Sequence, residues 1–334
     1  MSDFALVICP RENPELLKKD FFQKIFSSIF HLLKKKPEPA GLTRKVEIDE
    51  NLGVYVITLP YTINQLKKLK EKKLKATGML ISGICVQNRA EDCFLPQQVR
   101  DICLFEGCKY NPYKGKFLYR SLLPNLLSQI SHKRGMKTGD VDIAVVQGES
   151  HEELNAVLWL ISPHIKYVTV VVNDKKAVET MLEQLYSETG LSVGVTEDYA
   201  AGMKDADFII NLGGLRSSPP YPKMAPSAVV LNCGERDITD LPSNNIIVNG
   251  IQVNLPSNIL FQFDKGIYEY FSKQELSEIL LLHRLGIRQE TPGIYGSHEA
   301  MRKISEEFVK CGFKVTGFAG RHGYLKMEDM ETLR

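Results

Sequence analysis

The sequence lacks any long hydrophobic run, because no apolar stretch approaches the roughly 20 residues that a membrane-spanning helix needs. Its first residues, MSDFALVICPREN, also lack the basic segment and apolar core of a secretory signal. The net charge is only +2, and residues 1–75 carry 15 lysines and arginines against 9 acidic residues. That excess is too mild to indicate nucleic acid. We therefore expect a cytoplasmic protein with no membrane and no nucleic-acid partner.

Metal-binding cysteine pairs are also missing. The chain has 7 cysteines, but no two are spaced as Cys-x2-Cys, the pairing that shapes zinc and iron–sulfur sites. Cys85, Cys93, Cys103 and Cys108 follow one another at intervals of 7, 9 and 4 intervening residues. Reduced thiols that pack as small apolar groups explain this spacing, so we predict no metal site.

Neither a Ser/His/Asp arrangement nor a His-Glu-x-x-His motif occurs, and the sequence assigns no catalytic residue. No internal repeat or low-complexity tract is present either. The composition is otherwise ordinary for a soluble globular protein, because 43% of the 334 residues are apolar and 25% are charged. A chain of this length favours two domains.

The stretch 141–214 predicts the fold class. Its apolar runs end in Gly, Asn or Asp and alternate with segments of helical period, a pattern typical of parallel βαβ units. We predict six strands here and just beyond, at Val141–Gln147, Tyr167–Asn173, Leu191–Thr196, Asp207–Leu212, Ala228–Asn232 and Asn245–Val248. This order fits a Rossmann-like parallel sheet of the dinucleotide-binding type.

The rest of the chain predicts a second α/β unit and a C-terminal extension. Before the Rossmann-like part we expect strands at Phe4–Cys9, Lys45–Ile48, Val54–Leu59 and Gly78–Val86, with helices at Pro14–Lys36, Thr62–Lys75 and Leu95–Phe105. The phenylalanine-rich helix at Pro14–Lys36 packs on a core, or as the alternative lies on a membrane surface. We predict an N-terminal substrate-type α/β domain at 1–120, a Rossmann-like nucleotide-binding domain at 121–265, and a segment at 266–334 whose helix returns to the first domain.

Turns after the predicted strands supply the candidate cofactor site. Gly148 is the one glycine of the first turn, which Glu149 makes acidic and therefore unlike an ordinary phosphate cradle. Asp174 lies 26 residues further on, near the spacing of a ribose-binding acid, although a helix cap explains it equally. The predicted cofactor-binding residues are Gly148, Ser150, His151, Asn173, Asp174, Lys175, Asn211, Gly213 and Gly214.

Two segments carry a resemblance to a known family. VTVVVNDKKAVETMLEQL (168–185) and DADFIINLGG (205–214) resemble the NAD(P)-binding domain of the shikimate dehydrogenase and glutamyl-tRNA reductase type. GVYVITLPYT (53–62) is similar to a substrate-domain strand of shikimate dehydrogenases, with Thr62 near the position of their catalytic lysine. The resemblance implies NAD or NADP as the cofactor.

These observations leave two functions open. The first is an NAD(P)-dependent oxidoreductase acting on a small polar metabolite, with Thr58, Thr62, Asn88 and Arg89 as substrate-contacting residues. The second is a non-catalytic Rossmann-like protein with a regulatory or assembly role, which the acidic first turn favours. A small-molecule ligand is expected as partner, and a homodimer stays open.

Overall fold

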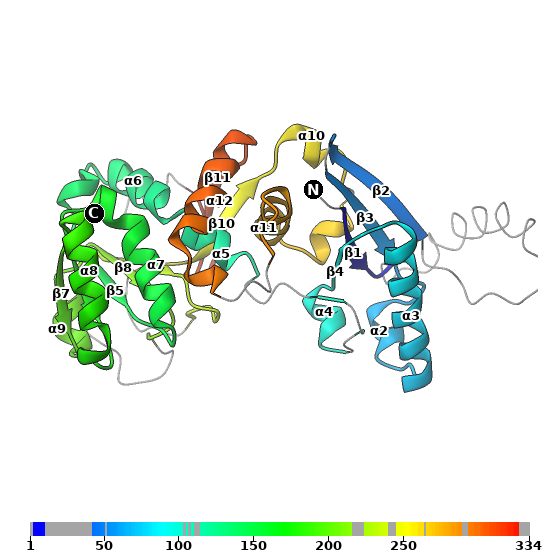
Figure 1. Ribbon diagram of the computed structural model, residues 1–334, viewed down its shortest axis with the longest axis horizontal. Helices are drawn as coiled ribbons and strands as arrows, with labels where there is room; N and C mark the ends of the chain where they lie inside the picture. Colours follow the sequence, from blue (N-terminus) through cyan, green and yellow to red (C-terminus); the bar gives the residue numbers. More distant parts are fainter. Residues whose placement is uncertain are drawn as a thin grey trace, which may run out of the picture. The chain divides into compact units, whose positions relative to one another are not determined.

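A computed structural model describes residues 3–10, 42–50, 52–102, 105, 108–109, 114–215, 224–239, 245–263, 265–288 and 293–326. The chain forms two compact units (Figure 1). Unit 1 comprises Met1–Pro112 and Ser257–Ser272, and unit 2 comprises Tyr113–Pro256 and Lys273–Arg334. The segment 266–334, predicted as one piece, is thus shared between the two units.

Unit 2 is built on an eight-stranded sheet with the order β12-β11-β10-β9-β8-β5-β6-β7. Its strands are β5 Ile143–Val146, β6 Tyr167–Val171, β7 Ser192–Thr196, β8 Phe208–Asn211, β9 Val229–Asn232, β10 Ile246–Asn254, β11 Lys314–Gly320 and β12 Gly323–Lys326. Strands β5 to β10 run parallel, and β11 and β12 add an antiparallel edge. The first six in chain order follow the Rossmann arrangement, with the order reversing between β5 and β8. The predicted Rossmann-like α/β fold is confirmed.

Helices cover both faces of this sheet. They are α5 Lys116–Ser121, α6 Leu123–Lys133, α7 His151–Ile161, α8 Glu179–Thr189, α9 Tyr199–Met203, α11 Lys273–Arg284 and α12 His298–Lys310, with 3-10 turns η1 Thr138–Asp140, η2 Ser162–His164, η3 Lys176–Val178 and η5 Ile294–Gly296. Strands β6 and β7 follow β5 on one side of the sheet, and β8, β9 and β10 are then added on the other side of β5. Right-handed crossovers in opposite directions place α7 and α8 on one face and α9 on the other. Met203 of α9 packs there with Val146 and Val171.

Unit 1 holds a smaller sheet with the order β2-β3-β1-β4, in which β2 alone is antiparallel. Its strands are β1 Phe4–Ile8, β2 Leu42–Asp49, β3 Leu52–Thr58 and β4 Asp92–Phe94. Its helices are α2 Ile63–Leu66, α3 Glu71–Gln87, α4 Gln97–Arg100 and α10 Ser257–Leu260, with the 3-10 turn η4 Ile267–Glu269. Strand β1 is fully buried because it lies between β3 and β4.

The strand predicted at Gly78–Val86 is wrong, since these residues belong to helix α3. Thr77, Gly78, Ile81 and Cys85 recur at helical spacing and are buried, while Met79 and Val86 are 77% and 79% exposed. A short apolar run cannot be distinguished by pattern alone from a buried helix. The helix predicted at Leu95–Phe105 is reduced to α4, and the one predicted at Pro14–Lys36 lies outside the described residues. Among the described helices, none combines the length and apolarity that a bilayer crossing requires.

Candidate functional site

The nine predicted cofactor-binding residues lie together at the edge of the unit 2 sheet that is formed by the carboxyl ends of its parallel strands. Gly148, Ser150 and His151 follow β5, and Asn173, Asp174 and Lys175 follow β6. Asn211 ends β8, and Gly213 and Gly214 come after it. Because β5 pairs with both β6 and β8 in parallel, these three strand ends are adjacent. Ligands of open α/β sheets bind at such an edge, where the strand order reverses.

At this reversal the loops after β5 and β8 touch backbone to backbone. A Cβ added to Gly148 would lie 2.1 Å from the carbonyl oxygen of Leu212, and one added to Gly214 would lie 2.1 Å from that of Gln147. Gly213 adopts a φ of 119°, in the region that favours glycine. These glycines are therefore required by close packing of the two loops, whether or not a ligand lies beside them.

Gln147 occupies the end of β5, directly before the turn. Its side chain is 4% exposed, and its Nε2 lies 3.0 Å from Nδ1 of His151. Its Oε1 is buried and has no hydrogen-bond partner among the described residues. A buried acceptor without a donor costs free energy, and native proteins satisfy nearly all such groups. The edge thus contains a buried acceptor that no donor among the described residues satisfies.

The first turn of α7 is occupied by its own acidic side chains. Ser150 caps the helix by accepting a hydrogen bond from the Glu153 amide at 3.1 Å, and its hydroxyl donates to Glu152 at 2.7 Å. The Ser150 hydroxyl, followed by the backbone amide of Glu152, holds the pKa of the Glu152 carboxyl below its usual value. Carboxylates suit the positive end of the helix dipole, so this terminus is already neutralised without a phosphate.

Two buried cations of α5 cover the neighbouring strand ends. Arg120, 1% exposed, donates to the carbonyl of Cys233 at 3.1 and 3.0 Å and forms an ion pair with Glu153 at 2.7 Å. Lys116 donates to the carbonyls of Asn232 and Asn249 and pairs with Asp237 at 3.3 Å. Burial lowers the pKa of Lys116, an effect that the charge of Asp237 opposes. Because these cations bind the carbonyls after β9 and within β10, they neutralise that part of the edge.

Three asparagines in a row link the ends of β8 and β9 to the middle of β10. Asn211 donates to Asn232 at 2.8 Å, and Asn232 donates to Asn249 at 2.8 Å. Asn211 also accepts hydrogen bonds from the Gly213 and Leu215 amides. The row ties the loops to the sheet, so Asn211 has a structural role that its sequence position did not reveal.

Asp174 forms a local turn after β6. Its Oδ1 accepts a hydrogen bond from the Lys176 amide at 2.9 Å, an arrangement typical of capping aspartates. Lys175 donates its amide to Glu197 at 3.0 Å, and Asn173 accepts from the Tyr199 hydroxyl at 3.3 Å. Asp174 is exposed at this edge, which is compatible with the ribose-binding role as well as with the cap.

The four predicted substrate residues of unit 1 are not brought together. Thr58 ends β3, and Thr62 caps α2 through a reciprocal pair with Gln65. Asn88 ends α3 and donates to the Ile84 carbonyl, and Arg89 follows with a φ of 54°. Because α3 runs back across the sheet, its end lies beside the start of β1, where Glu91 donates to the Asp3 carbonyl. Thr58 and Thr62 lie at the opposite edge.

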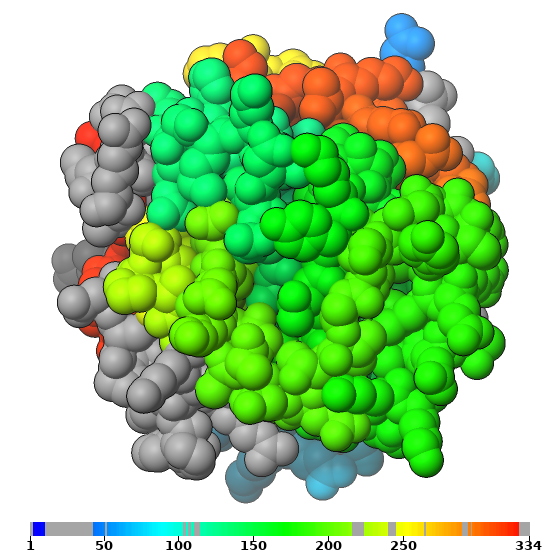
Figure 2. All heavy atoms as spheres, turned by 90° about the vertical axis from the view of Figure 1, so that its left-hand side faces the viewer, coloured from blue at the N-terminus to red at the C-terminus, as the bar shows by residue number. Residues whose placement is uncertain are grey.

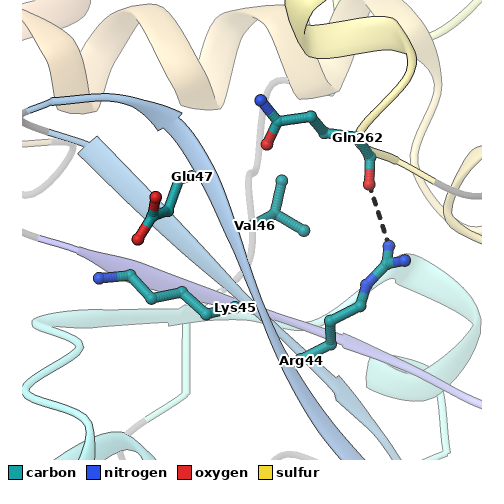
Figure 3. Close-up of a pocket in the computed structure, with 5 residues that line it drawn as sticks. All are labelled: Arg44, Lys45, Val46, Glu47 and Gln262. Carbon is teal, nitrogen blue, oxygen red and sulfur yellow. Dashed lines mark hydrogen bonds between the residues drawn. The ribbon is translucent and has the colours of Figure 1, made fainter.

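Two surface grooves open elsewhere in the described residues. One, of about 400 Å³, is lined in unit 1 by Gln262 and four residues of β2: Arg44, Lys45, Val46 and Glu47. Figure 3 shows Arg44 reaching the Gln262 carbonyl, with an N–O distance of 3.1 Å. The other, of about 380 Å³, lies in unit 2 between α8 and the edge strand β7, and includes Lys175 and Tyr186. In Figure 2 this part of unit 2 is coloured green, and its residues cover much of the face shown. Apart from Lys175, neither groove includes a residue of the strand-end site.

Sequence reasoning missed Gln147, Lys116 and Arg120 as parts of this edge. A signal for two of them existed, because Lys116 and Arg120 stand four residues apart in the segment KFLYRS, whose other residues are buried. Cations in a helix that is apolar on all sides require buried partners. No group of three or more potential metal ligands occurs within the described part of the chain.

Comparisons with known proteins do not identify a family for this chain. No family model matches the chain, and no curated protein does. Similar solved structures include L-tryptophan dehydrogenase from Nostoc punctiforme, at 14% identity over 99% of this chain and 86% of that one, with a TM-score of 0.29. The 5-ketofructose reductase of Gluconobacter sp. strain CHM43 is 12% identical over 92% and 99% of the two chains, with a TM-score of 0.31. Ornithine carbamoyltransferase from Pyrococcus furiosus is 13% identical over 63% and 58%, with a TM-score of 0.24.

Likenesses at these TM-scores carry no argument about activity. The chain's own strand order and strand-end residues define it as an α/β protein of two units, one of them Rossmann-like.

Proposed function

We propose that unit 2 binds NAD or NADP at the ends of β5, β6 and β8, and that the protein is an NAD(P)-dependent oxidoreductase acting on a small polar metabolite. The observation that carries the proposal is the buried Oε1 of Gln147, which has no donor among the described residues and lies where the strand order reverses. A ligand N–H or O–H group would satisfy it once the buried Gln147 side chain turns toward the strand-end surface. Asp174, at the end of the next strand, is suited to accept a hydrogen bond from a ribose hydroxyl.

The residues present fit a dinucleotide in part. Gln147 and Asp174 offer acceptors, and the α7 terminus offers amides, but Glu152 must release its own amide before a phosphate can approach. When bound, the nicotinamide supplies or accepts a hydride, and the protein orients it. The resemblance of segments 168–185 and 205–214 to the shikimate dehydrogenase type supports the same proposal.

A second function is suggested by the N-terminus of α7, whose first turn is occupied by the protein's own side chains. If Ser150, Glu152 and Glu153 keep the first turn of α7 closed, unit 2 is a Rossmann-like fold retained for regulation or assembly. The two functions differ in one measurable property, which is nucleotide binding.

Titration of the full chain with NAD, NADH, NADP and NADPH tests the proposal through the thermal unfolding midpoint. A ligand present at 100 times its Kd stabilises the folded state by about 2.7 kcal/mol. The absence of a shift with all four nucleotides at millimolar concentration would exclude the cofactor and leave the second function.

Variants of Gln147 and Asp174 test whether these two residues bind the nucleotide. Gln147→Met removes the unpaired acceptor and is expected to weaken nucleotide binding at least tenfold, or about 1.4 kcal/mol, without lowering the stability of the free protein. Ser131→Ala is the matched control, because Ser131 of α6 also carries a buried unpaired oxygen.

Asp174→Ala should weaken binding, whereas Asp198→Ala removes the cap of α9 and should alter stability alone. Equal affinities of the Asp174→Ala variant and the wild type would restrict Asp174 to capping.

A further inference from the structure

Three cysteines of unit 1 meet in its core. Cys93 of β4 and Cys108 lie with their Sγ atoms 3.6 Å apart. Cys85 of α3 lies within hydrogen-bonding reach of Cys93. Cys85 and Cys93 are buried, and Cys108 is partly exposed. The predicted absence of a metal left these thiols without a function.

The backbone aligns Cys93 with Cys108. Lys109 donates its amide to the Cys93 carbonyl at 2.7 Å and accepts from the Leu95 amide at 2.9 Å. These bonds form a parallel bridge between Phe94 and Lys109, and the residues before them, Cys93 and Cys108, are therefore also opposite. An ion pair between Lys109 and Asp92 holds the same segment.

This register meets the geometric requirement for a disulfide. Neighbouring strands lie about 4.8 Å apart, and disulfides join Cα atoms separated by roughly 4.4–6.8 Å. Opposite residues of paired strands point to the same face, as the 3.6 Å contact of the two Sγ atoms shows. Little backbone movement is needed to join them.

We propose that Cys93 and Cys108 are a reversible disulfide site that reacts with small-molecule disulfides of the glutathione type. The proposal is independent of the nucleotide site in unit 2. In the cytosol such bonds are transient and act in redox sensing or catalysis.

The exchange proceeds in two steps. The partly exposed Cys108 thiolate attacks one sulfur of the small disulfide, forming a mixed disulfide and releasing one thiolate, which takes up a proton. Cys93 then attacks the Sγ of Cys108, forming the protein disulfide and releasing the second small thiol. The protein loses two protons and two electrons, and one small disulfide becomes two thiols.

Cys85 assists the second step as a positioning residue. The hydrogen bond with Cys93 lowers the pKa of Cys85, whereas the hydrogen bonds with Cys108 and Cys85 raise the pKa of Cys93. Because Cys85 lies within hydrogen-bonding reach of Cys93, it is placed to take the Cys93 proton as Cys93 attacks. Cys85→Ser should still form the disulfide but accumulate more of the mixed disulfide on Cys108.

The test incubates the full chain with oxidised and reduced glutathione at several ratios, quenches with acid, alkylates the remaining thiols and maps the peptides. We expect a cross-link between Cys93 and Cys108 that dithiothreitol reverses and whose amount follows the glutathione ratio. A glutathione adduct that never proceeds to a cross-link, or a cross-link through any other cysteine, would overturn the proposal.

Two variants sharpen the result. Cys108→Ser should abolish the cross-link. Cys311→Ser is the matched control, because Cys311 is also partly exposed but has a pKa raised to about 11 by burial and by its hydrogen bond with Glu307. It should leave the cross-link unchanged. If Cys108→Ser does not fold, the wild-type peptide map decides the question.

Discussion

At the scale of single residues, the buried thiol of Cys233 links the stability of unit 2 to alkaline pH. Its side chain is fully buried, and burial raises its pKa from 9.0 to about 12. Below pH 9 the thiol is protonated in both folded and unfolded chains. Between pH 9 and about 12 the unfolded chain loses the proton while the folded chain keeps it. The free energy of unfolding therefore falls with rising pH in this window, by about 1.4 kcal/mol per unit.

Replacing Cys233 by Ala is expected to remove this contribution. Between pH 8 and pH 10 the wild type should lose about 1.4 kcal/mol more of its unfolding free energy than Cys233→Ala does. Urea unfolding followed by fluorescence measures it, because the chain's one tryptophan, Trp159, lies in α7 of unit 2.

The lowered pKa of Lys116 acts in the opposite direction, since its cost is relieved as the pH rises toward 10.5. It is present in both proteins, and only its coupling to the Cys233 charge differs between them. Parallel pH profiles for the two proteins would contradict the role given to the thiol.

At the scale of elements, the contact between the loops after β5 and β8 determines the shape of the candidate site. Each loop presents a glycine to a carbonyl of the other, with no room for a side chain. The order reversal of the sheet brings these loops together, so the contact is a property of the strand arrangement and not of either turn alone.

Gly148→Ala should therefore destabilise unit 2 by about 1–3 kcal/mol, because its Cβ meets backbone that has to shift. Gly83→Ala, in the exposed interior of α3, is the control and should stabilise the protein by about 0.5–1 kcal/mol, since a Cβ there meets nothing within 4 Å. Urea titration of both variants measures the difference. A neutral Gly148→Ala would mean that the loops move apart freely.

At the scale of the whole molecule, unit 2 is discontinuous in the chain. The segment after Lys273 returns to it and supports α5 from α11. Glu278 is fully buried and accepts hydrogen bonds from the amides of Gly115 and Leu118, at 3.3 and 2.7 Å. Gln274 accepts from the Ile251 amide and donates to the Gly115 carbonyl. Residues more than 150 positions apart in the sequence thus satisfy one helix terminus.

Glu278→Ala leaves two buried amides without acceptors and should cost about 2–6 kcal/mol, at roughly 1–3 kcal/mol for each unsatisfied group. Glu306→Ala, on the exposed side of α12, is the control and should change stability by less than about 0.5 kcal/mol. Trp159 fluorescence during urea unfolding reports both. A small effect of Glu278→Ala would show that water reaches the start of α5.

Residue patterns were sufficient for the parts of the fold in which local sequence and burial agree. The continuous Val and Ile runs of β5, β6 and β8 identified strands covered on both faces. They failed at α3, because Met79 and Val86 place apolar side chains on its solvent-facing side. That error also misplaced Asn88 and Arg89, which a strand would have brought to the edge of Thr58.

The sequence by itself determined the order of the six parallel strands of unit 2, because a strand buried on both faces must be apolar along its whole length. From that order followed which strand ends meet and which nine residues share an edge. Only the tertiary structure decided the contacts of those residues and their neighbours: Glu153 pairs with Arg120, Asn211 is tied to Asn232, and the Gln147 oxygen has no donor among the described residues. Such pairings join positions distant in the chain, and no local pattern encodes them. The function of the edge depends on these contacts.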